Sequence, residues 1–155
     1  MATVNTDPIY SKSGDIQTDT LAAATLLGPT ANTAQDGTGT IYPVFVADST
    51  NGGYVQKLMF QSITTVAATV CRVFISDTVP TITSGALVSN TSLNTHLFNE
   101  ISLPQITVSQ TVGSPHLELP INMALPPGYR ISVAFGTSTG ASTTGWNVIT
   151  VAGKY

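Results

Sequence analysis

The chain has 155 residues, of which 42% are hydrophobic and 8% are charged, and its formal net charge is −3. This length corresponds to one domain with a full hydrophobic core. A catalytic pocket usually needs several ionisable groups close together, and the small number of charged residues here therefore argues against an enzyme. Nucleic acid is also disfavoured as a primary partner, because the basic residues lie far apart in sequence. They are Lys12, Lys57, Arg72, Arg130 and Lys154.

The uncharged part of the chain predicts β-structure. About a quarter of the residues are serine or threonine. The branched Cβ of threonine suits a pleated strand, and glycine and proline mark turns. Lysine and glutamate, which are common on the surface of helices, are scarce. The composition therefore indicates an all-β protein.

Neither a membrane span nor a disulfide is expected. The uncharged segment 78–99 is long enough to cross a bilayer, but it is rich in Thr, Ser, Asn and Pro. Residues 1–5 have neither the basic region nor the apolar core of a signal peptide. Cys71 is the single cysteine, and it lies in the apolar segment 69–75, where a buried thiol is favoured over a nucleophile. We expect synthesis in a reducing cytoplasm.

The first residues differ from the rest. Residues 1–20 are more densely charged and poor in apolar side chains, which predicts an extended N-terminal arm or a loosely attached first strand. Residues 21–155 are expected to form a single β-sandwich domain. Within it, segment 21–27 is ambiguous between a short helix and a strand, and Gly28–Pro29 ends it.

From Thr40 onward the alternation of apolar and polar residues predicts strands. The predicted strands are Ile41–Ala47, Tyr54–Ile63, Thr69–Ser76, His96–Leu103, a short one at Ile106–Val108, Pro115–Ile121, Tyr129–Phe135 and Trp146–Val151. Pro43 suggests an edge position or a bulge. Residues 77–94 are expected to form a long loop, and residues 136–145 a flexible one.

The alternation also predicts how the strands pack. In 129–135 the odd-numbered residues are large and apolar, while Arg130, Ser132 and Ala134 share the other face. In 115–121 the leucines face one way, with His116 and Glu118 opposite. Such strands are typical of antiparallel sheets with one solvated side. About eight of them without helical crossovers predict a two-sheet antiparallel sandwich that is jelly-roll-like.

No catalytic, cofactor-binding or metal-binding residues are expected. His116 and Glu118 have a spacing suited to one metal ion, but a site needs about three or four ligands, and His96 is far away in sequence. Solvated surface residues are the preferred interpretation. Glu100 and Glu118, the two glutamates, would have to converge to act on a glycoside, and their flanking residues do not favour it.

Two short motifs resemble functional signatures, but we do not interpret either of them as a functional site. The segment Asp36–Gly39 is similar to the Asp-Thr/Ser-Gly loop of aspartic proteases, but the residue after the aspartate differs and there is no second copy. A turn with glycines at positive φ is preferred. Asn90–Ser92 matches a glycosylation acceptor, which has no meaning without a secretion signal. Serine hydrolase chemistry is disfavoured, since no Gly-x-Ser-x-Gly motif occurs.

The aromatic residues allow two interpretations. Trp146 and Tyr155, with Tyr54 and Tyr129, could form a platform on which sugars stack. The alternative, which is favoured, places Trp146 in the core of the sandwich.

Residues 33–155 resemble a family of small structural proteins of tailed bacteriophages. The resemblance lies in the order of short motifs, which are 36–40, 73–76, 100–104, 119–130, 135–137, 145–148 and the closing Gly153–Tyr155. Proteins of this kind are head decoration (cement) or head-fibre components, often trimeric, and not enzymes.

This resemblance implies a virion protein on the outer capsid surface, made in the host cytoplasm. Its expected partners are the major capsid protein and further copies of itself, with a trimer favoured. The N-terminal arm would tie neighbouring subunits together. The alternative function is a carbohydrate-binding module or a receptor-binding appendage of the virion.

Overall fold

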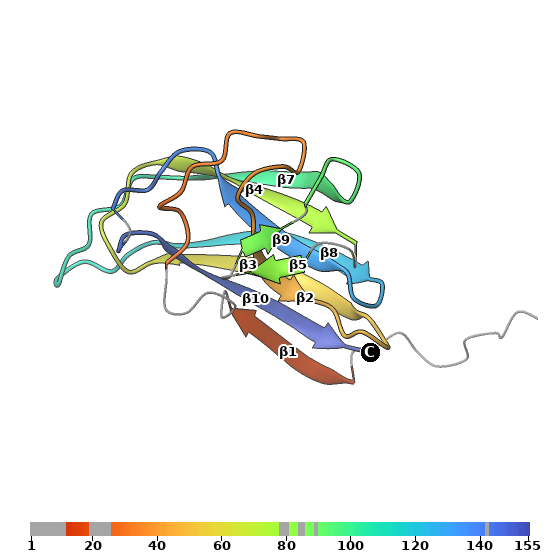
Figure 1. Cartoon of the computed structure of the whole chain (residues 1–155). Helices are drawn as coiled ribbons and strands as arrows, with labels where there is room; N and C mark the ends of the chain where they lie inside the picture. The colour runs from red at the N-terminus through yellow and green to blue at the C-terminus, as the bar shows by residue number, and fades with distance from the viewer. Residues whose placement is uncertain (1–11, 19–25, 78–80, 84–85, 89, 142) are drawn as a thin grey trace, which may run out of the picture.

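The computed structural model describes residues 12–18, 26–77, 81–83, 86–88, 90–141 and 143–155. Eight strands form two four-stranded antiparallel sheets packed as a sandwich, as predicted (Figure 1). Sheet A has the order β1-β10-β3-β8 and sheet B the order β2-β9-β4-β7. The strands of sheet A are β1 (Ser13–Thr18), β10 (Trp146–Lys154), β3 (Gly53–Ser62) and β8 (His116–Leu125). Those of sheet B are β2 (Tyr42–Val46), β9 (Arg130–Phe135), β4 (Thr69–Ser76) and β7 (Thr95–Leu103).

The strand pairs are nested along the chain. The first strand, β1, pairs with the last, β10, and the pairing continues inward through β2 with β9, β3 with β8 and β4 with β7. Two further ladders, β10 with β3 and β9 with β4, join these pairs into sheets. The chain therefore changes sheet at each connection between successive sandwich strands except the one from β4 to β7.

Residues 13–18 of the expected arm form β1, whereas residues 1–11 and 19–25, with most of segment 21–27, lie outside the described residues. The prediction of a long loop over residues 77–94 is wrong in part, because this segment contains a hairpin of two short strands, β5 (Thr81–Thr83) and β6 (Ala86–Val88). Strands this short show no clear periodicity. The predicted strand at Ile106 is a single bridge to Val66.

The hydrophobic core lies between the two sheets. Trp146, Phe45, Phe60 and Phe135 are its largest fully buried side chains, so the prediction that Trp146 belongs to the core is confirmed. Cys71 is also fully buried, as predicted, and burial raises the pKa of its thiol. In the described part of the chain no helix is long and apolar enough to cross a lipid bilayer.

The outer side of β9 in sheet B is buried, which corrects the expectation for this strand. Ser132 and Ala134 leave the strand opposite the core as predicted, but both are fully buried instead of solvated. The segment before β2, orange in Figure 1, runs over this sheet. Arg72 anchors the segment by donating from Nη1 to the carbonyl of Asn32 at 2.9 Å. Ile41 packs with Ala134 on the same face.

Candidate interaction surface

The outer face of sheet A is exposed across all four strands. Cross-strand register defines two central rows of side chains, Ile16–Val151–Lys57–Pro120 and Thr18–Ile149–Met59–Glu118. Ile16, Pro120 and Glu118 are exposed, with Ile16 at 70%, while Thr18 and the members on β10 and β3 are half-buried. We call these rows, with Tyr54, Ala124, Gln61 and His116 beside them, the open face.

The open face carries one ionic cluster, and its charges are paired. Lys57 Nζ lies 2.7 Å from Glu118 Oε1, and His116 Nε2 lies 3.3 Å from the same oxygen. The hydrogen bond from Lys57 is the main cause that holds the pKa of Glu118 below its ordinary value. Around this cluster the face is apolar or neutral, which is the chemistry of a protein-binding surface more than of a reactive site.

The structure does not bring together Glu100 and Glu118, the two carboxylates considered for glycoside hydrolysis. Glu118 lies on the open face with Lys57, and within the described residues no three His, Cys, Asp or Glu side chains are placed to hold a metal ion. Glu100 lies on β7 of sheet B, where its Oε1 accepts a hydrogen bond from Arg72 Nε at 2.9 Å. The two glutamates therefore belong to opposite faces of the sandwich.

The segment Asp36–Gly39 is a turn, as predicted. Gly37 and Gly39 have φ values of 86° and 82°. Asp36 Oδ1 accepts hydrogen bonds from the hydroxyl of Thr38 at 2.6 Å and from its N–H at 3.0 Å, and these lower the pKa of Asp36. Asn90 Nδ2 donates to the carbonyls of Gly37 and Gly39, so this amide fastens the turn to the chain before β7.

The four aromatic residues do not form one platform. Trp146 is inside the core and Tyr129 packs against the edge of the core. Tyr54 lies on the open face, where its hydroxyl is 3.3 Å from Asn122 Oδ1. Tyr155 follows β10 and is half-buried.

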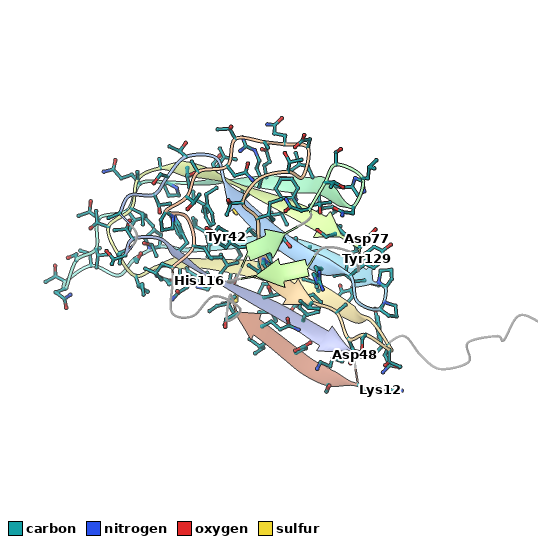
Figure 2. The ribbon with its side chains drawn as sticks, in the orientation of Figure 1. Lys12, Tyr42, Asp48, Asp77, His116 and Tyr129 are labelled. Carbon is teal, nitrogen blue, oxygen red and sulfur yellow. The ribbon has the colours of Figure 1, made fainter. Side chains whose placement is uncertain are left out.

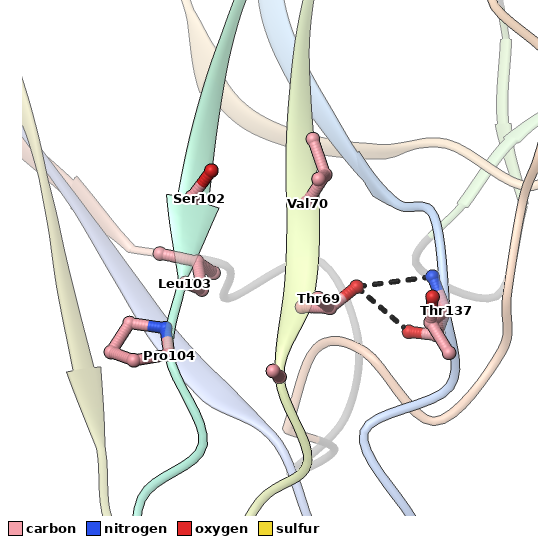
Figure 3. A pocket seen from close by; sticks show the side chains of 7 residues that line it. Thr69, Val70, Ser102, Leu103, Pro104 and Thr137 are labelled. Carbon is pink, nitrogen blue, oxygen red and sulfur yellow. Dashed lines mark hydrogen bonds between the residues drawn. The ribbon is translucent and has the colours of Figure 1, made fainter.

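A second surface feature is a shallow hollow of about 460 Å³ at the end of β4 and β7 (Figure 3). Thr69 Oγ1 forms two hydrogen bonds of 3.0 Å there, with the N–H and the carbonyl of Thr137. The side chains that line the hollow are apolar or carry hydroxyl groups, and none is ionisable. They are Ala68, Thr69, Val70, Ser102, Leu103, Pro104 and Thr137. The hollow therefore offers shape and hydroxyl groups but no acid or base.

No protein family, curated protein or solved structure matches the chain.

The sequence interpretation missed the open face, although a signal was present. In β10 the outward Ile149 and Val151 alternate with the buried Val148 and Thr150, so both faces of the strand carry β-branched side chains. A strand that is apolar on both faces is normally covered on both faces. Here the outward side is open, and that combination makes it a candidate contact surface.

Proposed function

We propose that the protein is a structural component of a tailed-bacteriophage virion, a decoration (cement) protein that binds major capsid subunits and stabilises the head. The observation that carries the proposal is the open face. An open sheet surface with Ile16, Ile149 and Met59 beside one ionic cluster of paired charges is suited to burial against another protein. The resemblance of residues 33–155 to phage head proteins is the reason for proposing the major capsid protein as the partner.

The nested strand pairs support a jelly roll, the architecture expected for such a protein. A jelly roll is a long antiparallel ribbon rolled up so that the first strand meets the last and successive pairs lie inward. The ladders β1–β10, β2–β9, β3–β8 and β4–β7 follow this order.

The size of the open face suits a lattice better than a single tight complex. Strands β1, β10, β3 and β8 have 6, 9, 10 and 10 residues. At about 3.4 Å per residue and about 4.8 Å between strands, they cover roughly 600 Å². A standard interface buries about 800 Å² per partner. Contacts of this size stabilise a capsid collectively, because each copy binds only the assembled lattice and shifts it away from dissociation. A trimer of this chain would present three such faces.

Carbohydrate binding is the weaker alternative, because its central aromatic residue, Trp146, is in the core. Tyr54 with Asn122 on the open face is what remains of an aromatic and amide surface that a glycan would contact.

The test uses virions purified by density gradient from a lysate of the phage that encodes this chain, with and without the gene. We expect the protein in wild-type particles at a fixed ratio to the major capsid protein, and particles without it should release their DNA at a lower temperature. Absence of the protein from purified particles, or equal heat stability of the two preparations, would overturn the cement function.

A pair of variants locates the binding surface. Ile16 on the open face and Val112 in the loop before β8 are both 70% exposed, so they form a matched pair. Added back to particles that lack the protein, Ile16→Lys should bind more weakly than wild type, and Val112→Lys should bind as wild type does. If Val112→Lys bound more weakly and Ile16→Lys bound as wild type does, the capsid contact would lie at the loop before β8 and not on the open face. Binding of either variant to a glycan array instead of to capsids would favour the alternative function.

A further inference from the structure

The turn between β2 and β3 contains two neighbouring residues, Asn51 and Gly52, that can react with each other. Asn51 is exposed, and it is the only asparagine of the chain that precedes a glycine. Glycine has no side chain to hinder the approach of its backbone nitrogen to the amide of the preceding residue. The pair therefore places a nucleophilic nitrogen directly after an electrophilic amide carbon.

The reaction open to this pair is deamidation through a cyclic imide. The backbone nitrogen of Gly52 attacks Cγ of Asn51, and the new N–Cγ bond closes a five-membered ring. The Cγ–Nδ2 bond breaks, and the amide nitrogen leaves as ammonia with the proton that Gly52 has lost. Water then adds to one of the two ring carbonyls and opens the ring to aspartate or isoaspartate. Water is the only co-reactant.

Asp48 holds both reacting groups in the native turn. Its carbonyl oxygen accepts the N–H of Gly52 at 3.1 Å, so the nucleophile keeps its proton in a hydrogen bond. Its Oδ1 accepts the N–H of Asn51 at 2.9 Å and lies 3.4 Å from Asn51 Nδ2, the nitrogen that would leave. Ring closure requires the Gly52 nitrogen and the Asn51 side chain to leave these partners.

Contacts with the rest of the sandwich keep the turn closed. The N–H of Gly128 donates to the same carbonyl of Asp48 at 3.2 Å. Gly52 has a φ of 79°, and a Cβ there would clash with the backbone oxygen of Leu125 at the end of β8. Figure 2 shows Asp48 and Lys12, the residue before β1, at the same end of the sandwich. The peptide between Asn51 and Gly52 can therefore rotate only when the turn opens.

We infer that Asn51 is a modification site, where spontaneous deamidation converts the amide to a carboxylate, and that Asp48 sets the rate by holding the turn closed. The product carries an additional negative charge near the Asp48 carboxylate. Isoaspartate also lengthens the backbone by one atom. Gly53, two residues later, pairs with both Leu125 and Lys154, so the longer backbone must displace the turn or these ladders.

Peptide mapping by mass spectrometry, after incubation of the full chain at mildly alkaline pH, tests the inference. Asn90 and Asn147 are internal references, because each precedes a β-branched residue. In urea, Asn51 should deamidate faster than both references. In the folded protein its rate should be lower by about tenfold or more, since a hydrogen bond to a charged group must break first. No preference for Asn51 in urea would overturn the modification site, and equal rates in the folded and unfolded chain would overturn the protection.

Two aspartate variants separate the turn from the stability of the whole fold. Asp48→Ala removes the Oδ1 acceptor, so Asn51 in the folded variant should deamidate about tenfold faster than in wild type. Asp36→Ala is the matched control, because Asp36 also accepts hydrogen bonds within its own turn, from Thr38. It should leave the rate at Asn51 unchanged, and circular dichroism verifies that each variant is folded. If the control accelerates the reaction as much as Asp48→Ala does, or if Asp48→Ala does not accelerate it, Asp48 does not set the rate.

Discussion

The side-chain amide of Gln17 forms two hydrogen bonds with the backbone of Val46. Nε2 donates to the Val46 carbonyl and Oε1 accepts from the Val46 N–H, each at 2.9 Å. Gln17 lies on β1, an edge of sheet A, and Val46 lies on β2, an edge of sheet B. A side chain therefore closes this side of the sandwich by occupying the free edge of β2. Nearby, Thr150 Oγ1 of β10 donates to the carbonyl of Val44 at 2.8 Å and joins the sheets a second time.

Replacing Gln17 with leucine should weaken the fold. Both bonds are lost and the backbone groups of Val46 lose these partners, so we expect the free energy of unfolding to fall by about 1–3 kcal/mol. Urea denaturation measures the change. Gln56→Leu alters an exposed glutamine of β3 and should stay within about 0.5 kcal/mol of wild type. Equal losses in the two variants would show that the bonds to Val46 do not hold the sheets together.

Edges and buried strands were predictable where single residues mark them. Pro43 predicted an edge or a bulge, and β2 is an edge strand whose register shifts between Pro43 and Phe45. The bounds predicted for β4, Thr69–Ser76, are those of the structure. In both cases the signal is local, either a missing N–H or a run of β-branched residues.

Long-range partners were not predictable. Nothing in the pattern of residues 13–18 indicates that Gln17 faces a strand 29 residues later. For the same reason the alternation of β9 gave the correct faces but the wrong environment, since Ala134 is buried against Ile41 of the segment that precedes β2. The open face was missed because periodicity tells which side chains share a face and not whether another segment lies on it.

The turn at Gly37 should tolerate no side chain. Its φ is +86°, and a Cβ there would lie 2.1 Å from the backbone oxygen of Thr95. Gly37→Ala must therefore move the turn away from β7, and we expect a loss of more than about 1 kcal/mol. Gly113→Ala is the control, because a Cβ at Gly113 meets no atom within 4 Å. If urea denaturation gives both variants the same stability, the contact of Gly37 with Thr95 is not important.

Cys71 should resist thiol reagents in the native state. The thiol is fully buried, and burial raises its pKa, so little of the reactive thiolate exists at neutral pH. We expect labelling by a disulfide reagent to be slow in buffer and complete in denaturing urea, at a native rate that follows the unfolding equilibrium. Fast labelling of native protein would place the thiol at the surface and contradict the assignment of Cys71 to the core.

Trp146 should report the core and not a ligand. It is the single tryptophan and has 0% of its surface exposed, so its emission should be blue-shifted and insensitive to acrylamide until the protein unfolds. No sugar should change the emission. A shift on adding a glycan, with the fold intact, would show that the indole is accessible and would revive the carbohydrate-binding alternative.

Acid should weaken the turn between β2 and β3 through Asp48. Its Oδ1 accepts the N–H groups of Asn51 and Thr50 at 2.9 Å each. These two bonds, with that of Asn51 the larger cause, hold the pKa of Asp48 below its ordinary value of 3.8. A carboxyl group with a lower pKa in the folded than in the unfolded state stabilises the fold above the unfolded value. That contribution disappears as the pH falls through the folded value.

Wild type should therefore lose stability as the pH falls below about 3.8, the ordinary value. Asp48→Asn keeps an acceptor oxygen for Thr50 and Asn51 but does not titrate, so its Tm should fall less steeply over the same interval. The measurement is Tm against pH for both proteins, from about pH 5 to about pH 2. Among the described residues, Asp36 and Glu118 also have carboxyl groups with lowered pKa, and they contribute to the remaining slope of the variant. Parallel curves for the two proteins would mean that the Asp48 carboxylate does not contribute to stability.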